Sequence, residues 1–477
     1  MFKTTLVLIA CTLLTACGAS FGASAEIQDG LKHETFDSDP GWEGNNNRLV
    51  PADGVPITKQ DFGYRNGKVG GWVARSATPA WYAKPIAPLT FNDKITASGK
   101  FAVASNKGNS GVLFGFFNDS SRGWRSANSL VFRLDGNSRG YWVFFEYGTQ
   151  HRYTGGGATF EGKRYQTTPT KPFPADGTVH EWTLSYNPDG ANGLGKIDLM
   201  LDGKTYSCEL QAGHKSDGAT FNRFGILNVQ NPGNGIEVYF SDLTINGKPE
   251  DLSNDPKWEG HGNEIEFPDR VRRPWHDFGF SITNNAGSKI GEIGGVIWRA
   301  GSPAYYADCV GPFTLDNPLH AEGKIAFTRS MADSGTCIGF FNARSKKDAA
   351  KLTEQDANEA DQLGIFVEGP SRVGHYFRPF YFNHDRQGIL LKDGPVILPD
   401  GQPHRWSLDY DPTGANGHGE ITVNFDDHTQ KLELNPKQRR TGASFDHFGL
   451  FNRHTGGSFV EVWLDDLKYS AIPVASK

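Results

Sequence analysis

The amino-acid sequence predicts an all-β protein built from two tandem β-sandwiches. Its 477 residues include 58 glycines, and 12% of the residues are aromatic, a composition typical of many short strands joined by turns. Segments rich in Val, Leu and aromatic residues alternate with Gly-, Asn- and Pro-containing turns along the chain. The same series of motifs also occurs twice, and each copy has the roughly 200 residues of one sandwich or jelly roll.

The duplication is clearest around residues 275–307. This stretch and residues 60–83 share Asp-Phe-Gly, Gly-Gly, Arg and Pro-Ala-aromatic-Tyr-Ala in the same order. Trp42 and Trp258 are 216 positions apart, whereas Trp182 and Trp406 are 224 apart, so the second copy has an 8-residue insertion before its Gly-Gly. We expect a leader and tether over residues 1–25, repeat 1 over residues 34–247, and repeat 2 over residues 250–470.

Each repeat reads as a series of strands separated by turns. The expected strands of repeat 1 are 110–117, 130–135, 141–147, 180–186 and 196–201, and those of repeat 2 include 404–410, 420–425 and 461–464. An Asn-Pro-Asp-Gly-Ala-Asn-Gly loop joins two of the strands in repeat 1, and a similar loop occurs in repeat 2. The one helical candidate, residues 346–362, is charged and Ala-rich, and we interpret it as a surface excursion with a solvated face.

The N-terminus has the features of an export signal. Lys3 precedes an apolar stretch, residues 4–15, that is too short to span a membrane. Leu-Thr-Ala-Cys17 resembles a bacterial lipobox, which implies a lipidated Cys17 and attachment to the membrane through an N-terminal lipid. The alternative is ordinary cleavage after Ala25. The expected location is the bacterial outer membrane or cell surface, or else the periplasm or the medium.

Charge and cysteine content narrow the possible partners. The net charge is −6 and the basic residues are dispersed, so a nucleic-acid partner is not expected. Three cysteines lie beyond the leader, at spacings that do not suggest a metal site. Cys309 and Cys337 either pair in an oxidising compartment or remain buried thiols, and Cys208 stays unpaired in the first case.

Three motifs carry a resemblance to a known family. They are the His-x-Trp strand, the Pro-x-Gly-Ala-Asn-Gly turn and the closing Trp/Tyr-x-x-Asp-Leu, and both repeats contain them. Together they resemble concanavalin A-like lectin/glucanase domains of the laminin-G-like bacterial type. The resemblance implies two tandem concanavalin A-like jelly-roll β-sandwiches, each with a concave glycan-binding face. That superfamily contains lectins, glycoside hydrolases and polysaccharide lyases.

We therefore expect a carbohydrate-active protein that acts on a polysaccharide, a glycoside hydrolase before a polysaccharide lyase. The alternative is a non-catalytic glycan-binding surface lipoprotein, and an adhesive or scaffolding role without a glycan also stays open. No organic cofactor is expected. A paired-carboxylate site is doubtful at Glu264 and Glu266, because the glucanase motif Glu-x-Asp-x-x-Glu is incomplete there.

Glu292 is the leading catalytic candidate. It belongs to the insertion and lies among Gly291, Gly294 and Gly295, where a ligand could approach closely. Asn284 and Asn285 could donate amide hydrogen bonds to sugar hydroxyls.

Matched positions in the two repeats suggest a binding face of arginines, acids and aromatic rings. The matched pairs are Arg75 with Arg299, Asp135 with Glu368, Tyr147 with Tyr381, and Arg152 with Arg386. A face of this kind fits sugar hydroxyls and rings, whereas the alternative is a structural ion pair beside core aromatics. The further candidates are Glu368, His375 and Tyr381 for catalysis, as the base of a lyase or as acids, and Arg299, Arg378, Arg386, Trp142 and Arg152 for substrate binding.

Differences at matched face positions suggest a division of labour. Repeat 1 has Arg133, Trp142 and Glu146 where repeat 2 has Phe366, Tyr376 and Phe380. Because repeat 2 also gains the loop that carries Glu292, we expect the principal site in repeat 2 or between the repeats.

The resemblance also implies a structural calcium ion shared by the opening segment and last strand of each repeat. Its candidate ligands are Glu43 and Asp242 in repeat 1, and Glu259 and Asp466 in repeat 2. The alternative role for these acids is capping of N-terminal turns.

Overall fold

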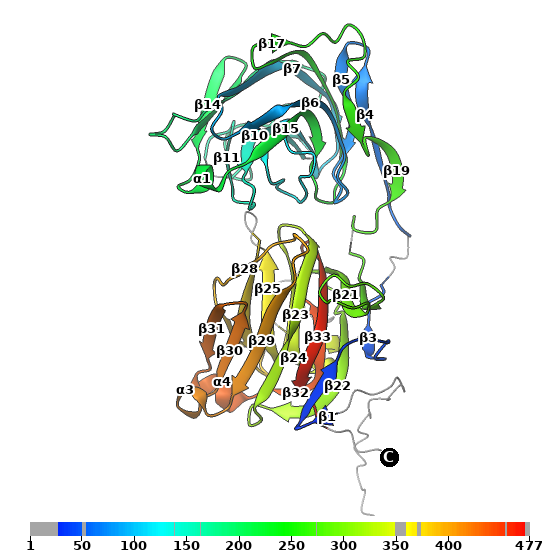
Figure 1. Ribbon diagram of the computed structural model, residues 1–477, viewed down its shortest axis with the longest axis vertical. Helices are drawn as coiled ribbons and strands as arrows, with labels where there is room; N and C mark the ends of the chain where they lie inside the picture. The colour runs from blue at the N-terminus through cyan, green and yellow to red at the C-terminus, as the bar shows by residue number, and fades with distance from the viewer. Residues whose placement is uncertain are drawn as a thin grey trace, which may run out of the picture.

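The computed structural model describes residues 27–49, 54–137, 139–162, 164–272, 274–348, 359–369, 374–453 and 456–472. Within these residues the chain forms four antiparallel sheets and four short helices. The sheets pack in pairs as two sandwiches, which Figure 1 shows stacked end to end. No helix among the described residues is long and apolar enough to cross a membrane. The leader and Cys17 lie outside the described residues.

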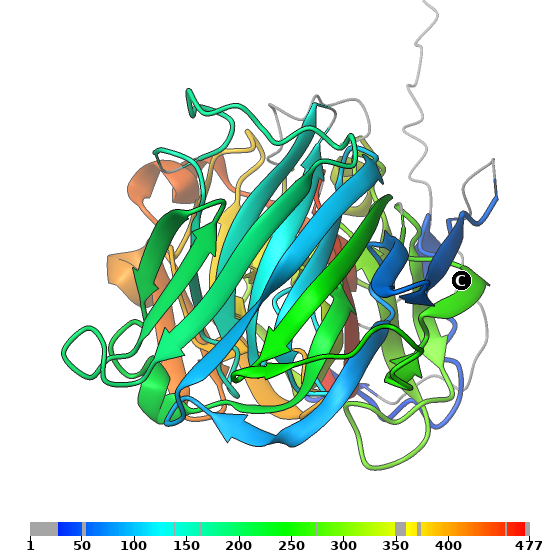
Figure 2. The same cartoon turned by 90° about the horizontal axis from the view of Figure 1, so that it is seen from above.

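The first sandwich pairs a nine-stranded sheet with a seven-stranded sheet. Figure 2 shows the larger sheet from above, with its strands side by side. Its order is β14 (Lys204–Glu209), β13 (Lys196–Leu201), β12 (Val179–Asn187), β7 (Ile95–Asn106), β16 (Gly235–Ile245), β5 (Lys68–Ala74), β4 (Ile57–Arg65) and β19 (Glu264–Pro268), with β17 (Lys248–Pro249) beside β16. The smaller sheet has the order β11 (Thr154–Ala158), β10 (Gly140–Gly148), β9 (Ser129–Asn137), β8 (Ser110–Phe117), β15 (Thr220–Asn228), β6 (Trp81–Thr90) and β18 (Glu259–His261). Helix α1 (His214–Asp217) lies before β15.

The second sandwich repeats this plan. Its larger sheet has the order β1 (Ile27–Gln28), β2 (Leu31–Glu34), β33 (Phe459–Ser470), β23 (Leu319–Ser330), β29 (His404–Asp411), β30 (Glu420–Phe425) and β31 (His428–Glu433), with β21 (Glu292–Trp298) beside β33 and β20 (Asp277–Ser281) beside β21. The smaller sheet has the order β27 (Gly388–Leu390), β26 (His375–Phe382), β25 (Gln362–Gly369), β24 (Ser334–Phe341), β32 (Ser444–Asn452), β22 (Tyr305–Thr314) and β3 (Glu43–Asn45), with β28 (Val396–Ile397) beside β26. The helices are α2 (Ala343–Asp348), α3 (Gly414–Gly417) and α4 (Pro436–Thr441).

The alternation of side chains along the strands builds one core in each sandwich. In β13, Ile197, Leu199 and Leu201 are buried, whereas the residues between them are partly exposed. This two-residue period places every second side chain between the paired sheets. Trp182 belongs to the core of the first sandwich and Trp406 to that of the second, so the matched His-x-Trp strands have the same structural role.

The opening segment of each repeat completes the other sandwich. Strand β3 pairs with β22 of the second sandwich, and β2 pairs with β33. In the reverse direction, β18 pairs with β6 and β19 pairs with β4 of the first sandwich. The sequence repeats at 34–247 and 250–470 are therefore not the hydrogen-bonded units. The first sandwich uses residues after 250, and the second begins its sheets at residue 27.

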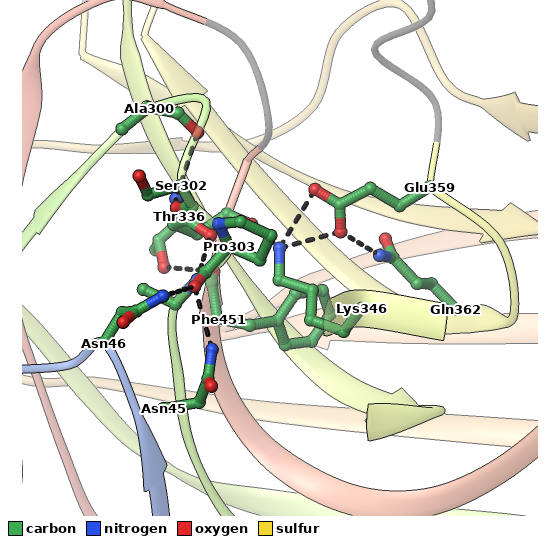
Figure 3. A network of polar contacts seen from close by, with 12 residues as sticks. Asn45, Asn46, Ala300, Ser302, Pro303, Thr336, Lys346, Glu359, Gln362 and Phe451 are labelled. Carbon is green, nitrogen blue, oxygen red and sulfur yellow. Dashed lines mark hydrogen bonds and ion pairs between the residues drawn. The ribbon is translucent and has the colours of Figure 1, made fainter. Parts of the chain in front are cut away.

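Matched contacts hold the two exchanged segments in equivalent ways. Trp42 packs against Tyr306 with ring centroids 5.7 Å apart, and Trp258 packs against Tyr82 at 5.8 Å. The Asn47 side chain donates to the Phe278 carbonyl at 2.7 Å, and Asn263 donates to the Phe62 carbonyl at 2.6 Å. Asn45 and Asn46 each donate to the Pro303 carbonyl at 2.9 Å, as Figure 3 shows.

An apolar cluster lies where the two sandwiches meet. We call it the junction cluster, and its buried members are Ala77, Val271, Val296, Trp298, Ala300, Met331 and Phe459. Trp124 of the first sandwich packs against it. The junction cluster therefore combines side chains of the first sandwich, the connecting segment and the second sandwich.

The expected surface helix at 346–362 is only partly correct. Helix α2 covers Ala343–Asp348, and residues 349–358 lie outside the description. Lys346 is not solvated, because its side chain is 0% exposed and forms an ion pair with Glu359 at 2.7 Å. Its ammonium also donates to the Asn452 carbonyl at 2.5 Å. The charge at this position therefore ties α2 into the second sandwich.

Candidate functional site

The outer face of the smaller sheet of the first sandwich carries polar and aromatic side chains. In β9, Leu134 points into the core, so Arg133 and Asp135 point to the opposite face. In β10, Val143 and Phe145 belong to the core. Trp142, Phe144 and Glu146 therefore lie on the outer face, beside Arg133 and Asp135.

A cavity of about 540 Å³ opens on this outer face, and we call it the first cavity. Its walls come from β9 and β10, from the loop after β11, and from Trp124 in the loop after β8. The lining residues are Arg75, Asn109, Trp124, Arg133, Asp135, Gly136, Asn137, Trp142, Phe144, Phe160, Arg164, Tyr165 and Gln166. Five of these residues are aromatic and three are arginines, whereas Asp135 is the single acid among them.

Arg133 is the electrostatic centre of the first cavity. It is 5% exposed, pairs with Asp135, and lies 3.3 Å from Glu146. Burial acts to lower the pKa of the Arg133 guanidinium, but Glu146 and Asp135 outweigh it and raise the pKa above its usual value. The guanidinium also lies over the Phe144 ring, 4.4 Å from its centroid. Arg133 is therefore held as a cation against an aromatic wall.

Arg75 supplies a second buried cation with unused hydrogen-bonding capacity. It is 6% exposed, its Nη1 donates to Asn109 at 2.9 Å, and it lies 3.9 Å from Asp135. Burial lowers the pKa of Arg75, which Asp135 partly opposes. Among the described residues, neither Arg75 Nε nor Trp142 Nε1 has a hydrogen-bond acceptor. Both residues line the first cavity, although these two nitrogens themselves are buried below its surface.

On the corresponding face of the second sandwich, the described residues form a layer of apolar side chains. The layer is a buried cluster formed by Tyr305, Ala307, Cys337, Phe341, Ala343, Phe366, Phe380, Phe382 and Phe451. The predicted pair of Arg299 and Glu368 does form, at 3.4 Å, and Arg378 also pairs with Glu368. The Arg378 guanidinium lies over the Phe366 ring at 5.2 Å. These groups form an ion-pair network at the edge of an apolar layer.

Glu292 is not accessible, which contradicts its predicted catalytic role. It is 0% exposed, and its carboxylate accepts hydrogen bonds from Asn285 N, Asn285 Nδ2 and Ala286 N, each at 2.8 Å. Asn285 is therefore committed to Glu292, whereas Asn284 is exposed on the same loop. Gly291 has a φ of +116°, and a Cβ there would lie 1.9 Å from the Phe36 carbonyl oxygen. The glycine accommodates the chain's own backbone rather than a ligand.

His375 and Tyr381 are also inside the molecule. His375 Nε2 lies 2.7 Å from Ser334 Oγ, and burial lowers the pKa of His375 to about 3. Tyr381 belongs to the core, where burial raises the pKa of its phenol well above the usual range. Neither side chain is placed to act as the base of a lyase.

The remaining predicted binding residues are dispersed. Trp142 lines the first cavity. Arg152 and Arg386 occupy matched turns with φ of +66° and +62°. Arg152 donates to the Arg122 carbonyl at 2.8 Å, and Arg386 is exposed. Sequence reasoning did not place Trp124, Arg164 and Tyr165 at the site, because they lie outside the motifs that the two repeats share.

The structure separates the two proposed ligands of each calcium site, because Glu43 and Asp466 lie in the second sandwich and Asp242 and Glu259 lie in the first. Each carboxylate instead contacts a cation: Glu43 contacts Lys347 at 2.9 Å, Asp242 contacts Lys100 at 2.9 Å, Glu259 contacts Arg223 at 2.8 Å, and Asp466 contacts Lys324 at 2.6 Å. Burial acts to raise the pKa of Glu43, but hydrogen bonds from Tyr305 and Lys347 lower it to about 2. Within the described part of the chain, no group of three His, Cys, Asp or Glu could hold a metal ion.

The structure also bears on the possible cysteine pair and on the paired carboxylates. Cys309 on β22 and Cys337 on β24 are not joined by a disulfide, since β32 lies between their strands. Two strand spacings amount to about 9.6 Å, which is beyond the Cα separation of a disulfide. Glu264 and Glu266 are exposed on the edge strand β19, where Glu264 contacts Arg65 at 3.2 Å.

Comparisons with known proteins yield matches among solved structures. No family model matches the chain, and no curated protein matches it. Domains LG4-5 of the mouse laminin alpha1 chain match with a TM-score of 0.26 and 12% identity over 87% of this chain and 92% of that chain. The carbohydrate recognition domain of Emp47p matches with a TM-score of 0.27 and 12% identity over 48% and 98%. The alginate lyase vAL-1 from Chlorella virus matches with a TM-score of 0.22 and 11% identity over 41% and 92%. In its own sheets, the chain folds as two tandem all-β sandwiches of antiparallel strands.

Proposed function

We propose that this protein is an exported polysaccharide-binding protein that holds an anionic glycan in the first cavity. The observation that carries the proposal is that Arg75, Arg133 and Arg164 line the first cavity beside a wall of aromatic rings. Sugars present apolar ring faces that pack on Trp or Tyr, and hydroxyls and carboxylates that accept hydrogen bonds. Arginine suits carboxylate and sulfate groups because its planar fork can donate two parallel hydrogen bonds.

The charges of the first cavity favour binding over hydrolysis. A glycosidase needs one carboxyl group that is free to donate a proton and a second that is free to attack or to activate water. Asp135 pairs with Arg133, and Glu146 pairs with both Arg133 and Arg125. These contacts occupy the oxygens of both acids, so neither is well placed as a general acid.

Polysaccharide lyase activity is the second candidate, and Tyr165 is the observation that favours it. Tyr165 is exposed, lines the first cavity, and interacts electrostatically with Arg75. A lyase needs a base for the proton beside a uronate and a cation that neutralises the carboxylate. In this reading Tyr165 removes the proton and Arg75 holds the carboxylate.

Binding measurements with a panel of glycans test the proposal. The panel contains a polyuronate, a sulfated glycan and a neutral glycan of similar length. We expect binding of an anionic glycan that weakens with salt, and Trp142→Ala should weaken it by about tenfold. Tyr376→Ala at the matched position of the second sandwich is the control. Ultraviolet absorbance of unsaturated uronate ends identifies a lyase, whereas failure to bind any anionic glycan would refute the proposal.

We also propose that Cys17 carries the lipid that attaches the protein to the membrane. One lipidated cysteine would then supply the whole attachment. Cys17→Ala should move the protein from the membrane fraction to the soluble fraction, whereas Cys11→Ala, within the apolar stretch, should not. Unchanged fractionation of the Cys17 variant would show that another feature holds the protein.

A further inference from the structure

The second sandwich has a cavity of its own, on the outer face of its larger sheet. Its volume is about 240 Å³, and we call it the second cavity. Its charged and aromatic lining residues are Arg48, Arg270, Arg329, Trp275, Trp463, Asp277 and Glu461. It combines arginines with indole rings, as the first cavity does, although the two cavities lie on different sheets.

The insertion of repeat 2 supports one wall of the second cavity. Ala286 of the inserted loop is buried against Ala326 and Trp463. The Glu292 carboxylate holds Ala286 in place through its backbone N–H at 2.8 Å. Glu292 thus has a positioning role, since it fixes the loop that packs against Trp463.

The matched surface of the first sandwich has different side chains. At a spacing of 224 residues, Tyr239 corresponds to Trp463, and Ser105 corresponds to Arg329. Repeat 1 also lacks the inserted loop. The arginine and the tryptophan therefore occur together with the loop, as expected if all three serve the same site.

The cations of the second cavity remain available to a ligand. Arg48 and Arg270 share one acid, Asp277, while their side chains are 52% and 66% exposed. Arg329 donates to Glu461 at 2.5 Å and is 39% exposed. Three arginines therefore face two acids, and a guanidinium that bonds one carboxylate keeps further N–H donors. An anionic group is the ligand that this balance favours.

The two cavities border the same junction cluster. Trp124 lines the first cavity and packs against the cluster, whereas Val271 and Val296 belong to the cluster and line the second cavity. Arg48 reaches the second cavity because the opening segment of the chain crosses into the second sandwich. The exchange of segments and the insertion thus both contribute to a site beside the junction.

We propose that the second cavity is an additional subsite for the same anionic polysaccharide, so that one glycan chain contacts both sandwiches across the junction. This inference rests on the proposed function of the first cavity. Its physical consequence is avidity, because once the first cavity holds a long chain, binding at the second becomes intramolecular. A short oligosaccharide that fills only the first cavity gains nothing from the second.

The test compares a polymer with a short oligosaccharide of the same sugar, using the full-length chain. Arg329→Gln and Trp463→Ala change the second cavity, and Tyr239→Ala changes the matched position that lacks the loop. We expect each of the two variants to weaken polymer binding by about tenfold or more and to leave oligosaccharide binding unchanged. The control should alter neither. A polyuronate and a sulfated polymer of matched length show whether carboxylate or sulfate is the recognised group.

The outcomes separate the two proposals. Polymer affinity that is the same in Arg329→Gln, Trp463→Ala and the control would overturn the second subsite. An equal loss for polymer and oligosaccharide would overturn it as well, since the second cavity would then not act as a separate subsite. If polymer binding depends on Arg329 but is insensitive to Trp142→Ala, the second cavity binds the glycan and the function proposed for the first cavity is wrong.

Discussion

The Glu292 carboxylate accepts a hydrogen bond from the backbone N–H of Ala286 at 2.8 Å, and this contact lets an inserted loop close over the sheet of the second sandwich. Asn285 adds a backbone and a side-chain N–H at the same distance. A buried carboxylate is stable here because three donors replace water around it. The acid that the sequence marks as most reactive is therefore the anchor of a loop.

Replacing Glu292 tests this structural role. Glu292→Gln puts a side-chain NH₂ group against N–H donors, so at least one buried donor loses its acceptor. We expect the free energy of unfolding to fall by about 1–3 kcal/mol, while oligosaccharide binding at the first cavity is unchanged. Thermal unfolding measures the loss. Glu266→Gln on the exposed edge strand should have no effect, and an unaffected melting temperature in Glu292→Gln would contradict the anchoring role.

His375 should contribute to the pH dependence of stability. Its pKa falls from an ordinary 6.5 to about 3 in the folded protein because of burial. Ser334 Oγ donates to the Met331 carbonyl, so it accepts from His375 Nε2–H, and a proton on Nδ1 would lie unsatisfied in the core. The unfolded chain binds a proton below about pH 6.5 that the folded chain does not bind. The contribution of His375 to the free energy of unfolding is therefore fully present above the pKa of the unfolded chain, and it is lost as the pH falls towards 3.

Chemical denaturation at several pH values can isolate this contribution. One differential proton corresponds to a slope of about 1.4 kcal/mol per pH unit within the window. His375→Gln should be less stable at neutral pH, because it loses packing against Phe327, but its stability should fall less steeply with acidification. The exposed His428→Gln is the control. Parallel pH profiles for wild type and His375→Gln would show that the imidazole titrates normally.

Lys346 and Glu359 form a buried ion pair that can be tested by a double-mutant cycle. Lys346→Met leaves the Glu359 carboxylate without its cation in a site where both side chains are almost fully buried. The expected cost is about 3–5 kcal/mol of unfolding free energy, and replacing both residues by Met and Leu should cost less. The exposed pair Lys431–Glu420, also at 2.7 Å, is the control, and Lys431→Met should cost less than about 1 kcal/mol. Equal effects at the two pairs would contradict this account.

The fold was predictable because its signals are local. Alternation along strands such as β13 identifies the buried face, and turn residues separate the strands. The exchange of opening segments was not predictable, because the repeat shows which segments correspond but not which copy they pair with. Trp42 and Trp258 are the same residue type at matched positions, so the sequence does not show which sandwich each one enters. The length and path of the connecting segments determine that pairing.

The site was partly predictable from matched positions. The sequence showed that repeat 1 has Arg133 and Trp142 where repeat 2 has Phe366 and Tyr376. In the structure, Arg133 and Trp142 line the first cavity, whereas Phe366 belongs to a buried apolar cluster. The prediction for Glu292 failed because an acid among glycines was interpreted as accessible, whereas its side chain is buried. Accessibility depends on long-range packing, such as the approach of the Phe36 carbonyl to Gly291, which has no local sequence signal.

The segment exchange makes a specific prediction about fragments of the chain. A fragment of residues 34–247 follows the sequence repeat, but it lacks β18, β19 and Trp258, which complete the first sandwich. A fragment of residues 54–272 contains all three and omits the segment that belongs to the second sandwich. The shorter fragment leaves the β4 and β6 edges unpaired and loses a buried indole, whose removal typically costs about 3–5 kcal/mol.

We therefore expect residues 54–272 to give a cooperative thermal transition and to retain glycan binding at the first cavity, whereas residues 34–247 should aggregate or melt at a lower temperature. Trp258→Ala in residues 54–272 should reproduce much of the loss without changing the length of the chain. Trp42→Ala in the full-length chain is the matched variant for the second sandwich, because Trp42 packs there against Tyr306 and Tyr469. If the two fragments are equally stable, the first sandwich does not depend on the opening segment of repeat 2.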